Sequence, residues 1–176
     1  DLPTTDSRKL GNRIVNSQDA DRVERAIALA VHFHRGQRDK AGTPYLMHLF
    51  RVALQAKDPV VQQAALLHDL IEDTDATLED LVSAGICPEA IEAISLLTHD
   101  LKESYANYVV KIKNNLVATQ VKLLDLHDNY RLDRVAYRSD HVREDATRIQ
   151  KYILSKQFLD DEISKDVYMK SMADLE

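Results

Sequence analysis

Cysteine, glycine and proline are scarce in this sequence of 176 residues, which holds one cysteine, four glycines and four prolines. A single cysteine, Cys87, excludes an internal disulfide and is typical of a reducing compartment, so we expect a cytoplasmic protein. Residues that break helices are few, while Leu and Ala are abundant and charged residues make up 30% of the chain. This balance favours helices joined by short loops.

Long apolar runs are missing as well, since none approaches the roughly 20 residues that span a bilayer. Residues 1–12 are polar and lack the apolar centre of a secretory signal, so we expect no membrane partner. The net charge of −6 comes with no basic stripe, which disfavours a nucleic-acid partner. The same acid excess suits a site that gathers carboxylates around a cation.

The composition is that of a globular protein, with 44% hydrophobic residues in a length typical of one domain. Apolar side chains recur at helical spacing, as Val23, Ile27 and Ala30 illustrate, and no stretch alternates with a period of two for long enough to require a strand. The sequence therefore predicts an all-α, single-domain helical bundle with about eight helices. The expected helices cover residues 19–34, 45–56, 60–72, 77–85, 88–98, 103–113, 116–130 and 140–158.

Three segments are expected along the chain. They are an N-terminal extension (1–18), a helical domain (19–160) and a C-terminal tail with a short surface helix (161–176).

The strongest local signal is LLHDLIEDT, residues 66–74. An acid such as Asp69 inside an apolar helix is costly to bury unless it has a partner, and a divalent cation is a good one. His68 and Asp69 point about 100° apart on a helix, so other elements would have to complete a metal site. The alternative is a buried His–Asp hydrogen-bonded pair, with Glu72 and Asp73 capping the helix end, where acids oppose the helix dipole.

Two further polar residues lie in apolar surroundings. His48 occurs in PYLMHLFRVA, where a histidine with its hydrogen bonds satisfied in the core is the alternative to a metal ligand. Asp125 occurs in VKLLDLHDNY, where an exposed helix face is the alternative. Together with His68 and Asp69 they make a set of two histidines and two carboxylates, which suits Mn²⁺, Fe²⁺ or Zn²⁺ more than Mg²⁺ or Ca²⁺.

These motifs, in their order, resemble the HD superfamily, and within it the hydrolase domain of RelA/SpoT-type proteins and the stand-alone small alarmone hydrolases. The resemblance runs from about residue 26 to about residue 134. It is carried by HRGQ, GTPYLMH, AALLHDLIEDTDAT, ESYANYV and VKLLDLHDN. It implies an HD-type helical bundle and hydrolysis of the 3′-pyrophosphate of a nucleotide such as ppGpp, which releases pyrophosphate. A small-molecule nucleotide is therefore the expected partner.

The resemblance also implies roles for particular residues. One divalent ion, usually Mn²⁺, would be held by four ligands, and Glu72 and Asp73 would orient or activate the attacking water. Asn129 matches a position beside the bound nucleotide. The implied ligands are His48, His68, Asp69 and Asp125.

Four more residues are candidates for substrate contacts, each with a simpler alternative. Lys40 lies in the loop of residues 36–44 and would otherwise be a solvated lysine. Arg51 and Lys122 flank implied ligands and would hold phosphate oxygens, or else pair with nearby acids. Tyr105, in ESYANYV, is a candidate contact or a core residue.

The sequence departs from the family pattern at a few positions. Asp39 stands where many members have an arginine that stacks on guanine, with Arg38 beside it. Leu49 replaces the usual Pro after His48. Leu126 and His127 replace the common Arg-Leu after Asp125. None of these changes removes an implied ligand, so we expect activity and leave open the choice between (p)ppGpp and (p)ppApp.

Two other functions fit the same motifs. The first is an HD-type phosphomonoesterase acting on a deoxynucleotide or an NADPH-like substrate. The second is a catalytically inactive, nucleotide-binding regulatory module. The sequence does not define an oligomeric state.

Overall fold

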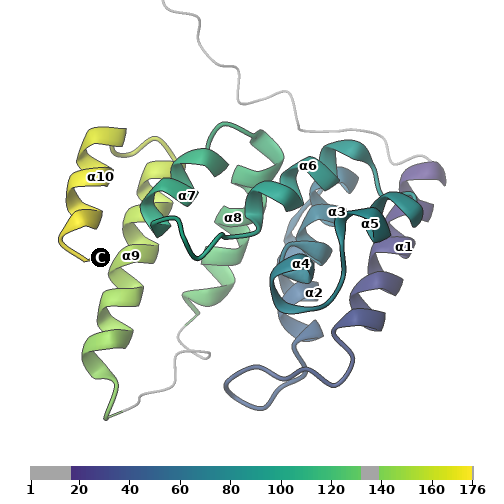
Figure 1. Ribbon diagram of the computed structural model, residues 1–176, viewed down its shortest axis with the longest axis horizontal. Coiled ribbons are helices and arrows are strands. Elements are labelled where there is room, and N and C mark those ends of the chain that lie inside the picture. The colour runs from purple at the N-terminus through teal and green to yellow at the C-terminus, as the bar shows by residue number, and fades with distance from the viewer. Residues whose placement is uncertain (1–16, 132–138, 176) are drawn as a thin grey trace, which may run out of the picture.

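The computed structural model describes residues 17–131 and 139–175, which form a bundle of α-helices (Figure 1). Of the N-terminal extension expected at residues 1–18, all but the last two residues lie outside the described part. The helices are α1 (Ser17–Phe33), α2 (Leu46–Gln55), α3 (Pro59–Leu67), α4 (Leu70–Asp73), α5 (Leu78–Ser83), α6 (Pro88–Leu97), α7 (Tyr105–Ile112), α8 (Leu116–Asn129), α9 (Val142–Leu159) and α10 (Lys165–Ala173).

Helix α3 is the centre of the fold, because it packs against α1, α2, α6 and α8. Its apolar sequence is buried almost throughout, with Ala64, Ala65 and Leu67 fully removed from solvent. Helix α8 lies between this group and the pair α7 and α9, and it contacts both sides (Figure 1). The all-α prediction is confirmed, and α3 and α8 bring the two acidic motifs of the sequence together.

Local signals explain where several helices begin. Asp58 caps α3 by accepting hydrogen bonds from the backbone N–H groups of Val60 and Val61, and Pro59 occupies the first turn, where its missing N–H costs nothing. The capping box expected from Thr77 and Asp80 is present at the start of α5. These caps fix the residues at which α3 and α5 begin.

One expected helix is interrupted. The sequence predicted a continuous helix over residues 60–72, whereas α3 ends at Leu67 and α4 begins at Leu70. Asp69 has φ −97° and ψ 0°, outside the helical region. Neighbouring side chains on a regular helix point about 100° apart, so this break allows His68 and Asp69 to face the same centre.

The C-terminal tail contains the short helix that was expected, but α10 does not lie simply on the surface. It packs against α9 and α7 and buries Tyr168 and Met172 completely. The ring of Tyr168 stacks on Phe158, with centroids 4.6 Å apart. Within the described residues, no helix is both long and apolar enough to cross a membrane.

Truncating the central helix should destabilise the whole bundle. We expect Leu67→Ala to lower the free energy of unfolding by about 2–5 kcal/mol, because it leaves a cavity among four helices. Leu54→Ala on α2, where the side chain is 81% exposed, is the matched control. Urea denaturation followed by circular dichroism measures both, and equal losses would contradict the central role of α3.

Candidate metal centre and adjoining pocket

Three helices bring the candidate ligands together. His48 comes from α2, His68 from the end of α3, and Asp125 from the middle of α8. One ligand atom from each of these residues lies within 4.8 Å of the other two. Asp69 stands beside them, with its Oδ2 atom 3.0 Å from Nε2 of His68 and 3.8 Å from Nε2 of His48. The four side chains predicted as ligands therefore converge.

The hydrogen bonds of the two histidines determine which ring nitrogen faces this centre. Nδ1 of His68 lies 2.8 Å from the carbonyl oxygen of Ala65 and must donate to it, because a carbonyl only accepts. Nδ1 of His48 lies 2.7 Å from Oδ2 of Asp128. In the neutral rings, each Nε2 atom then presents a lone pair to the carboxylates, and Nε2 of His68 is buried without a hydrogen bond. This arrangement fits a cation that both nitrogens and both carboxylates bind.

The electrostatics of the centre also favour a cation. Burial lowers the pKa of His68, but the charges of Asp69 and Asp125 beside its imidazole hold it well above its usual value. Burial raises the pKa of Asp125, but the ammonium of Lys122 and the imidazoles of His48 and His68 hold it well below its usual range. The negative potential that draws a proton to His68 also draws a metal ion.

Asp128 supports the centre, and sequence reasoning did not identify its role. It is almost fully buried and links His48 to Arg51, which donates from Nε to Oδ1 at 2.7 Å and from Nη2 to Oδ2 at 3.1 Å. A carboxylate behind a metal-binding imidazole orients the ring and raises its basicity. The only signal in the sequence was an acid three residues after Asp125, which also fits an exposed helix face.

Tyr45 is a second residue whose role the sequence did not reveal. Its hydroxyl donates a hydrogen bond to Oδ2 of Asp69. Burial and the charge of Asp69 raise the pKa of Tyr45 strongly, so the hydroxyl keeps its proton and remains a donor. The ring lies next to those of His34 and His48. Tyr45 therefore holds Asp69 in the orientation that faces both imidazoles.

The two acids predicted to act on water lie on α4. Glu72 is exposed, and its Oε2 accepts a hydrogen bond from the backbone N–H of His99 at 3.1 Å. Asp73 is also exposed. Partial burial and the charge of Asp69 raise the pKa of Asp73. Both residues belong to α4, which begins directly after the candidate ligand Asp69.

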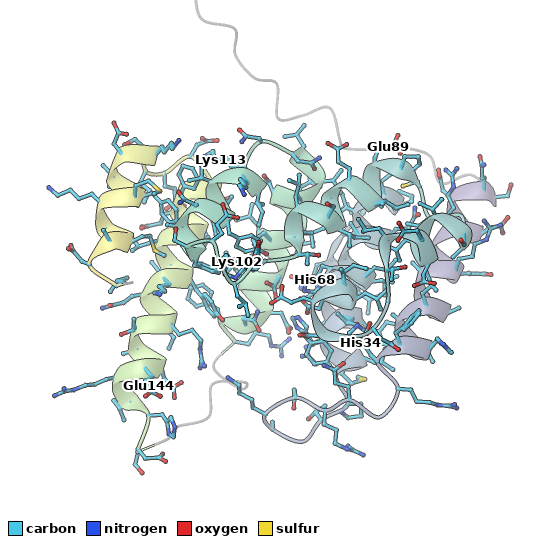
Figure 2. All side chains as sticks on the ribbon, in the orientation of Figure 1. His34, His68, Glu89, Lys102, Lys113 and Glu144 are labelled. Carbon is cyan, nitrogen blue, oxygen red and sulfur yellow. The ribbon has the colours of Figure 1, made fainter. Side chains whose placement is uncertain are left out.

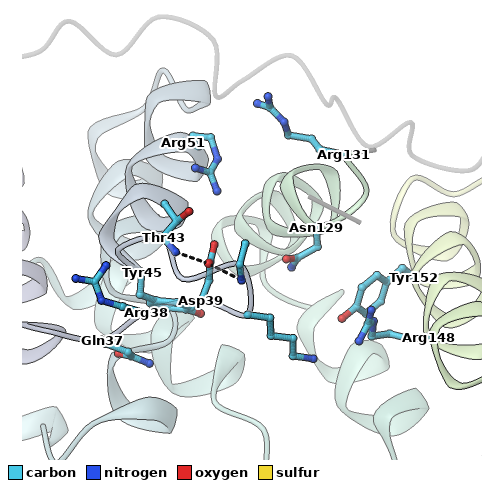
Figure 3. Close-up of a pocket in the computed structure, with 12 residues that line it drawn as sticks. Gln37, Arg38, Asp39, Thr43, Tyr45, Arg51, Asn129, Arg131, Arg148 and Tyr152 are labelled. Carbon is cyan, nitrogen blue, oxygen red and sulfur yellow. Dashed lines mark hydrogen bonds between the residues drawn. The ribbon is translucent and has the colours of Figure 1, made fainter. Parts of the chain in front are cut away.

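A pocket of about 520 Å³ adjoins the centre (Figure 3). Among the described residues, its lining includes Arg38, Lys40, Arg51, Arg131 and Arg148, against one acid, Asp39. Such a surplus of cations stands out in a chain whose net charge is −6. The pocket is therefore suited to an anionic ligand.

Three lining side chains also bind the carboxylates of the centre. Besides Tyr45 and Arg51, Nδ2 of Asn129 donates to Oδ1 of Asp125 at 2.6 Å. The pocket is thus one hydrogen bond away from the candidate ligands. One end of a ligand bound in this pocket would lie next to the candidate metal ligands.

The residues predicted to contact substrate fall into two groups. Lys40, Arg51 and Asn129 line the pocket. Lys122 and Tyr105 are not among its lining residues and lie inside the bundle, where the Lys122 ammonium is 5.7 Å from the centre of the Tyr105 ring. The Tyr105 hydroxyl is buried without a hydrogen bond.

Asp39, the residue that departs from the family pattern, helps to build the pocket's loop. Its Oδ1 atom accepts hydrogen bonds from the backbone N–H groups of Ala41 and Thr43, both at 2.9 Å (Figure 3). Gly42, with φ +80°, makes the tight turn between them. Nη1 of Arg38 donates to the carbonyl of Gly42 at 2.9 Å. The loop is therefore held in shape from within.

The known proteins that resemble this chain include guanosine-3′,5′-bis(diphosphate) 3′-pyrophosphohydrolases and GTP pyrophosphokinases, although no family model matches the chain. A mouse guanosine-3′,5′-bis(diphosphate) 3′-pyrophosphohydrolase, MESH1, is 45% identical over 71 residues, which are 36% of this chain and 40% of that protein. The Escherichia coli bifunctional (p)ppGpp synthase/hydrolase SpoT is 32% identical over 124 residues, 62% of this chain and 18% of SpoT. The matches thus cover less than half of these relatives.

A solved structure has the same fold. It is a metazoan ortholog of SpoT described as hydrolysing ppGpp, with a TM-score of 0.56 and 23% sequence identity. The likeness covers 84% of this chain and 89% of that one. It extends the comparison from the motif region to most of the bundle.

Removing the carboxylate behind His48 should weaken the metal centre. We expect Asp128→Asn to lower the affinity for Mn²⁺ by about 10- to 100-fold, because the amide neither orients nor polarises the imidazole as a carboxylate does. Isothermal titration calorimetry measures this, with Asp166→Asn, on the exposed side of α10, as control. Equal affinities in the two variants would show that His48 does not bind the ion through this relay.

Proposed function

We propose that this chain is an HD-type relative of the RelA/SpoT hydrolases and removes the 3′-pyrophosphate from an alarmone nucleotide, (p)ppGpp or (p)ppApp, because part of its sequence is similar to MESH1 and SpoT and its fold to that of a SpoT ortholog. The observation that supports this most directly is the position of the pocket. A pocket rich in arginine and lysine adjoins a buried set of two imidazoles and two carboxylates. Hydrolysis of a nucleotide with two pyrophosphate groups needs cations that bind its phosphates and a centre that can hold a metal ion.

The ion proposed for the centre is Mn²⁺, held by His48, His68, Asp69 and Asp125. A mixed nitrogen and oxygen donor set of this kind suits Mn²⁺, Fe²⁺ or Zn²⁺. When bound, such an ion polarises phosphoryl oxygens and lowers the pKa of water. The protein's own part is to hold the four side chains in place, through Asp128, Tyr45, Asn129 and the carbonyl of Ala65.

The pocket would bind the nucleotide through its cations. Arg38, from the loop, and Arg148, from α9, line it from opposite sides (Figure 3), and Lys40 of the same loop is also a lining residue. Guanidinium and ammonium groups are the usual protein partners of phosphate oxygens. Asn129 and Arg51 lie where this pocket meets the carboxylates, so we propose that they contact the part of the substrate nearest the reacting phosphate.

Proton transfer is assigned to Glu72 and Asp73. The raised pKa of Asp73 brings it closer to the range in which a carboxylate accepts a proton effectively. Glu72 is held by the backbone of His99, so its carboxylate has a fixed anchor. We propose that one of the two orients the attacking water and takes up its proton.

Base preference is the least constrained part of the proposal. The carboxylate of Asp39 binds the backbone of its own loop, and so has a structural part at the position where the family commonly has an arginine. Arg38 lines the pocket beside it. The guanine and adenine nucleotides therefore have to be compared directly. The cytoplasmic location expected from the lone Cys87 also stays a prediction, which cell fractionation would test.

Product analysis tests the proposed reaction. We expect the Mn²⁺-loaded protein to release pyrophosphate from ppGpp or ppApp, and Asp69→Ala to lose both this activity and most of its bound metal, because a ligand is removed. The two nucleotides are incubated side by side and the products are separated by ion-exchange chromatography. Orthophosphate as the sole product would instead support a phosphomonoesterase.

A second variant separates chemistry from binding. Glu72→Gln keeps an oxygen that can accept the hydrogen bond from His99 but cannot take a proton. We expect kcat to fall by about 100-fold or more while metal content and thermal stability stay unchanged. Glu79→Gln, at an exposed position in α5, is the control. Nucleotide binding without turnover in the wild-type protein would favour the regulatory module.

A further inference from the structure

Lys122 is a buried cation in direct contact with one of the candidate ligands. Its side chain, on α8, is only 12% exposed. The ammonium lies 3.0 Å from Oδ2 of Asp125, one turn further along the same helix. A lysine is costly to bury, so its position in the bundle needs compensation from its surroundings.

Two tyrosines of α7 supply part of that compensation. The Lys122 ammonium lies 5.7 Å from the ring centre of Tyr105 and 5.4 Å from that of Tyr108. Ring faces attract a cation at such distances. The hydroxyl of Tyr108 donates a hydrogen bond to the carbonyl of Leu97, and this bond anchors α7 to α6. The ammonium is therefore held between two rings and one carboxylate.

The two oxygens of Asp125 have separate partners as a result. Oδ2 binds Lys122. Oδ1 accepts from Asn129 at 2.6 Å and lies 3.4 Å from Nε2 of His48 and 3.7 Å from Nε2 of His68. Only Oδ1 faces the imidazoles.

We propose that Lys122 is a positioning residue whose permanent charge restricts Asp125 to one metal-binding oxygen and weakens the hold of the centre on its ion. The inference rests on the proposed metal site. A hydrogen-bonded ammonium withdraws electron density from Asp125 and repels a cation on its other side. The bound ion then keeps more of its charge for the phosphate oxygens of the substrate.

Lys122 and Asp128 should change the metal affinity in opposite directions. Asp128 accepts a hydrogen bond from a ligand and should strengthen metal binding, whereas Lys122 donates one to a ligand and should weaken it. Loss of Lys122 should therefore tighten metal binding while it impairs turnover. A residue that bound substrate phosphate would instead raise KM, and a purely structural residue would affect stability alone.

Three substitutions at this position separate the contributions. Lys122→Gln removes the charge and keeps a donor, Lys122→Met removes both, and Lys122→Arg keeps both. Lys113→Met is the matched control, because Lys113 also lies over an aromatic ring, that of Phe158 at 4.3 Å, and pairs with Asp161 at 2.7 Å. Figure 2 labels both Lys113 and His68, and the two lie well apart in the bundle.

Mn²⁺ affinity, measured by titration calorimetry and by the electron paramagnetic resonance signal of free Mn²⁺, is the first readout. We expect about tenfold tighter binding in Lys122→Gln and Lys122→Met, and wild-type affinity in Lys122→Arg and Lys113→Met. In steady-state hydrolysis, the two neutral variants should lose about tenfold in kcat with KM within about twofold of wild type. Lys122→Gln, the smaller change, serves if Lys122→Met does not fold.

Each other result overturns the inference. Unchanged or weaker Mn²⁺ binding in the neutral variants would exclude the proposed effect of the charge, and a rise in KM alone would make Lys122 a substrate contact. Both of these results concern the Lys122 variants and would not contradict Mn²⁺ binding by the wild-type protein. A wild-type protein that binds no Mn²⁺ would overturn the proposed metal centre itself. If it binds Mn²⁺ but hydrolyses neither nucleotide, only the proposed reaction fails, and the affinities still test Lys122.

Discussion

Burying two carboxylates and two imidazoles where α2, α3 and α8 meet is the constraint on which the rest of this structure depends. An isolated charge in such a place would destabilise the fold by several kcal/mol, so each group needs a partner. Lys122 pairs with Asp125, and Arg51 pairs with Asp128 behind His48. Tyr45 donates to Asp69. After these pairings, the Nε2 atoms and the inner carboxylate oxygens still converge on one another, which is the condition a metal ion satisfies.

The same pairings connect the centre to the pocket. Tyr45, Arg51 and Asn129 each bind a carboxylate of the centre and also line the pocket. A ligand that displaced or strengthened one of these hydrogen bonds would be felt at the candidate ligands. Substrate binding and metal binding, as proposed, are therefore expected to be coupled through these side chains.

The relatives resemble this chain in the motif region and in the fold. Matches to MESH1 and SpoT cover 36% and 62% of the chain, and the solved SpoT ortholog extends the likeness to 84% of it. At Asp39 the side chain stabilises its own loop through Ala41 and Thr43. Recognition of the base then depends on the other residues around the pocket, among which Arg38, Arg148 and Tyr152 present cationic and aromatic groups.

The sequence by itself determined most of the helices, the candidate ligands His48, His68, Asp69 and Asp125, and the resemblance to the RelA/SpoT hydrolases. Apolar periodicity, caps such as Thr77 with Asp80, and an acid within an apolar run are local properties that a chain displays before it folds. Only the tertiary structure decided the break between α3 and α4, and which side chains support the ligands. Asp128 lies 80 positions from His48, and Tyr45 lies 24 from Asp69. For Lys122, the sequence left open a phosphate contact and a pair with a nearby acid. Asp128 and Tyr45 look like ordinary residues of amphipathic helices in the sequence, because a partner brought close by packing leaves no mark on local spacing.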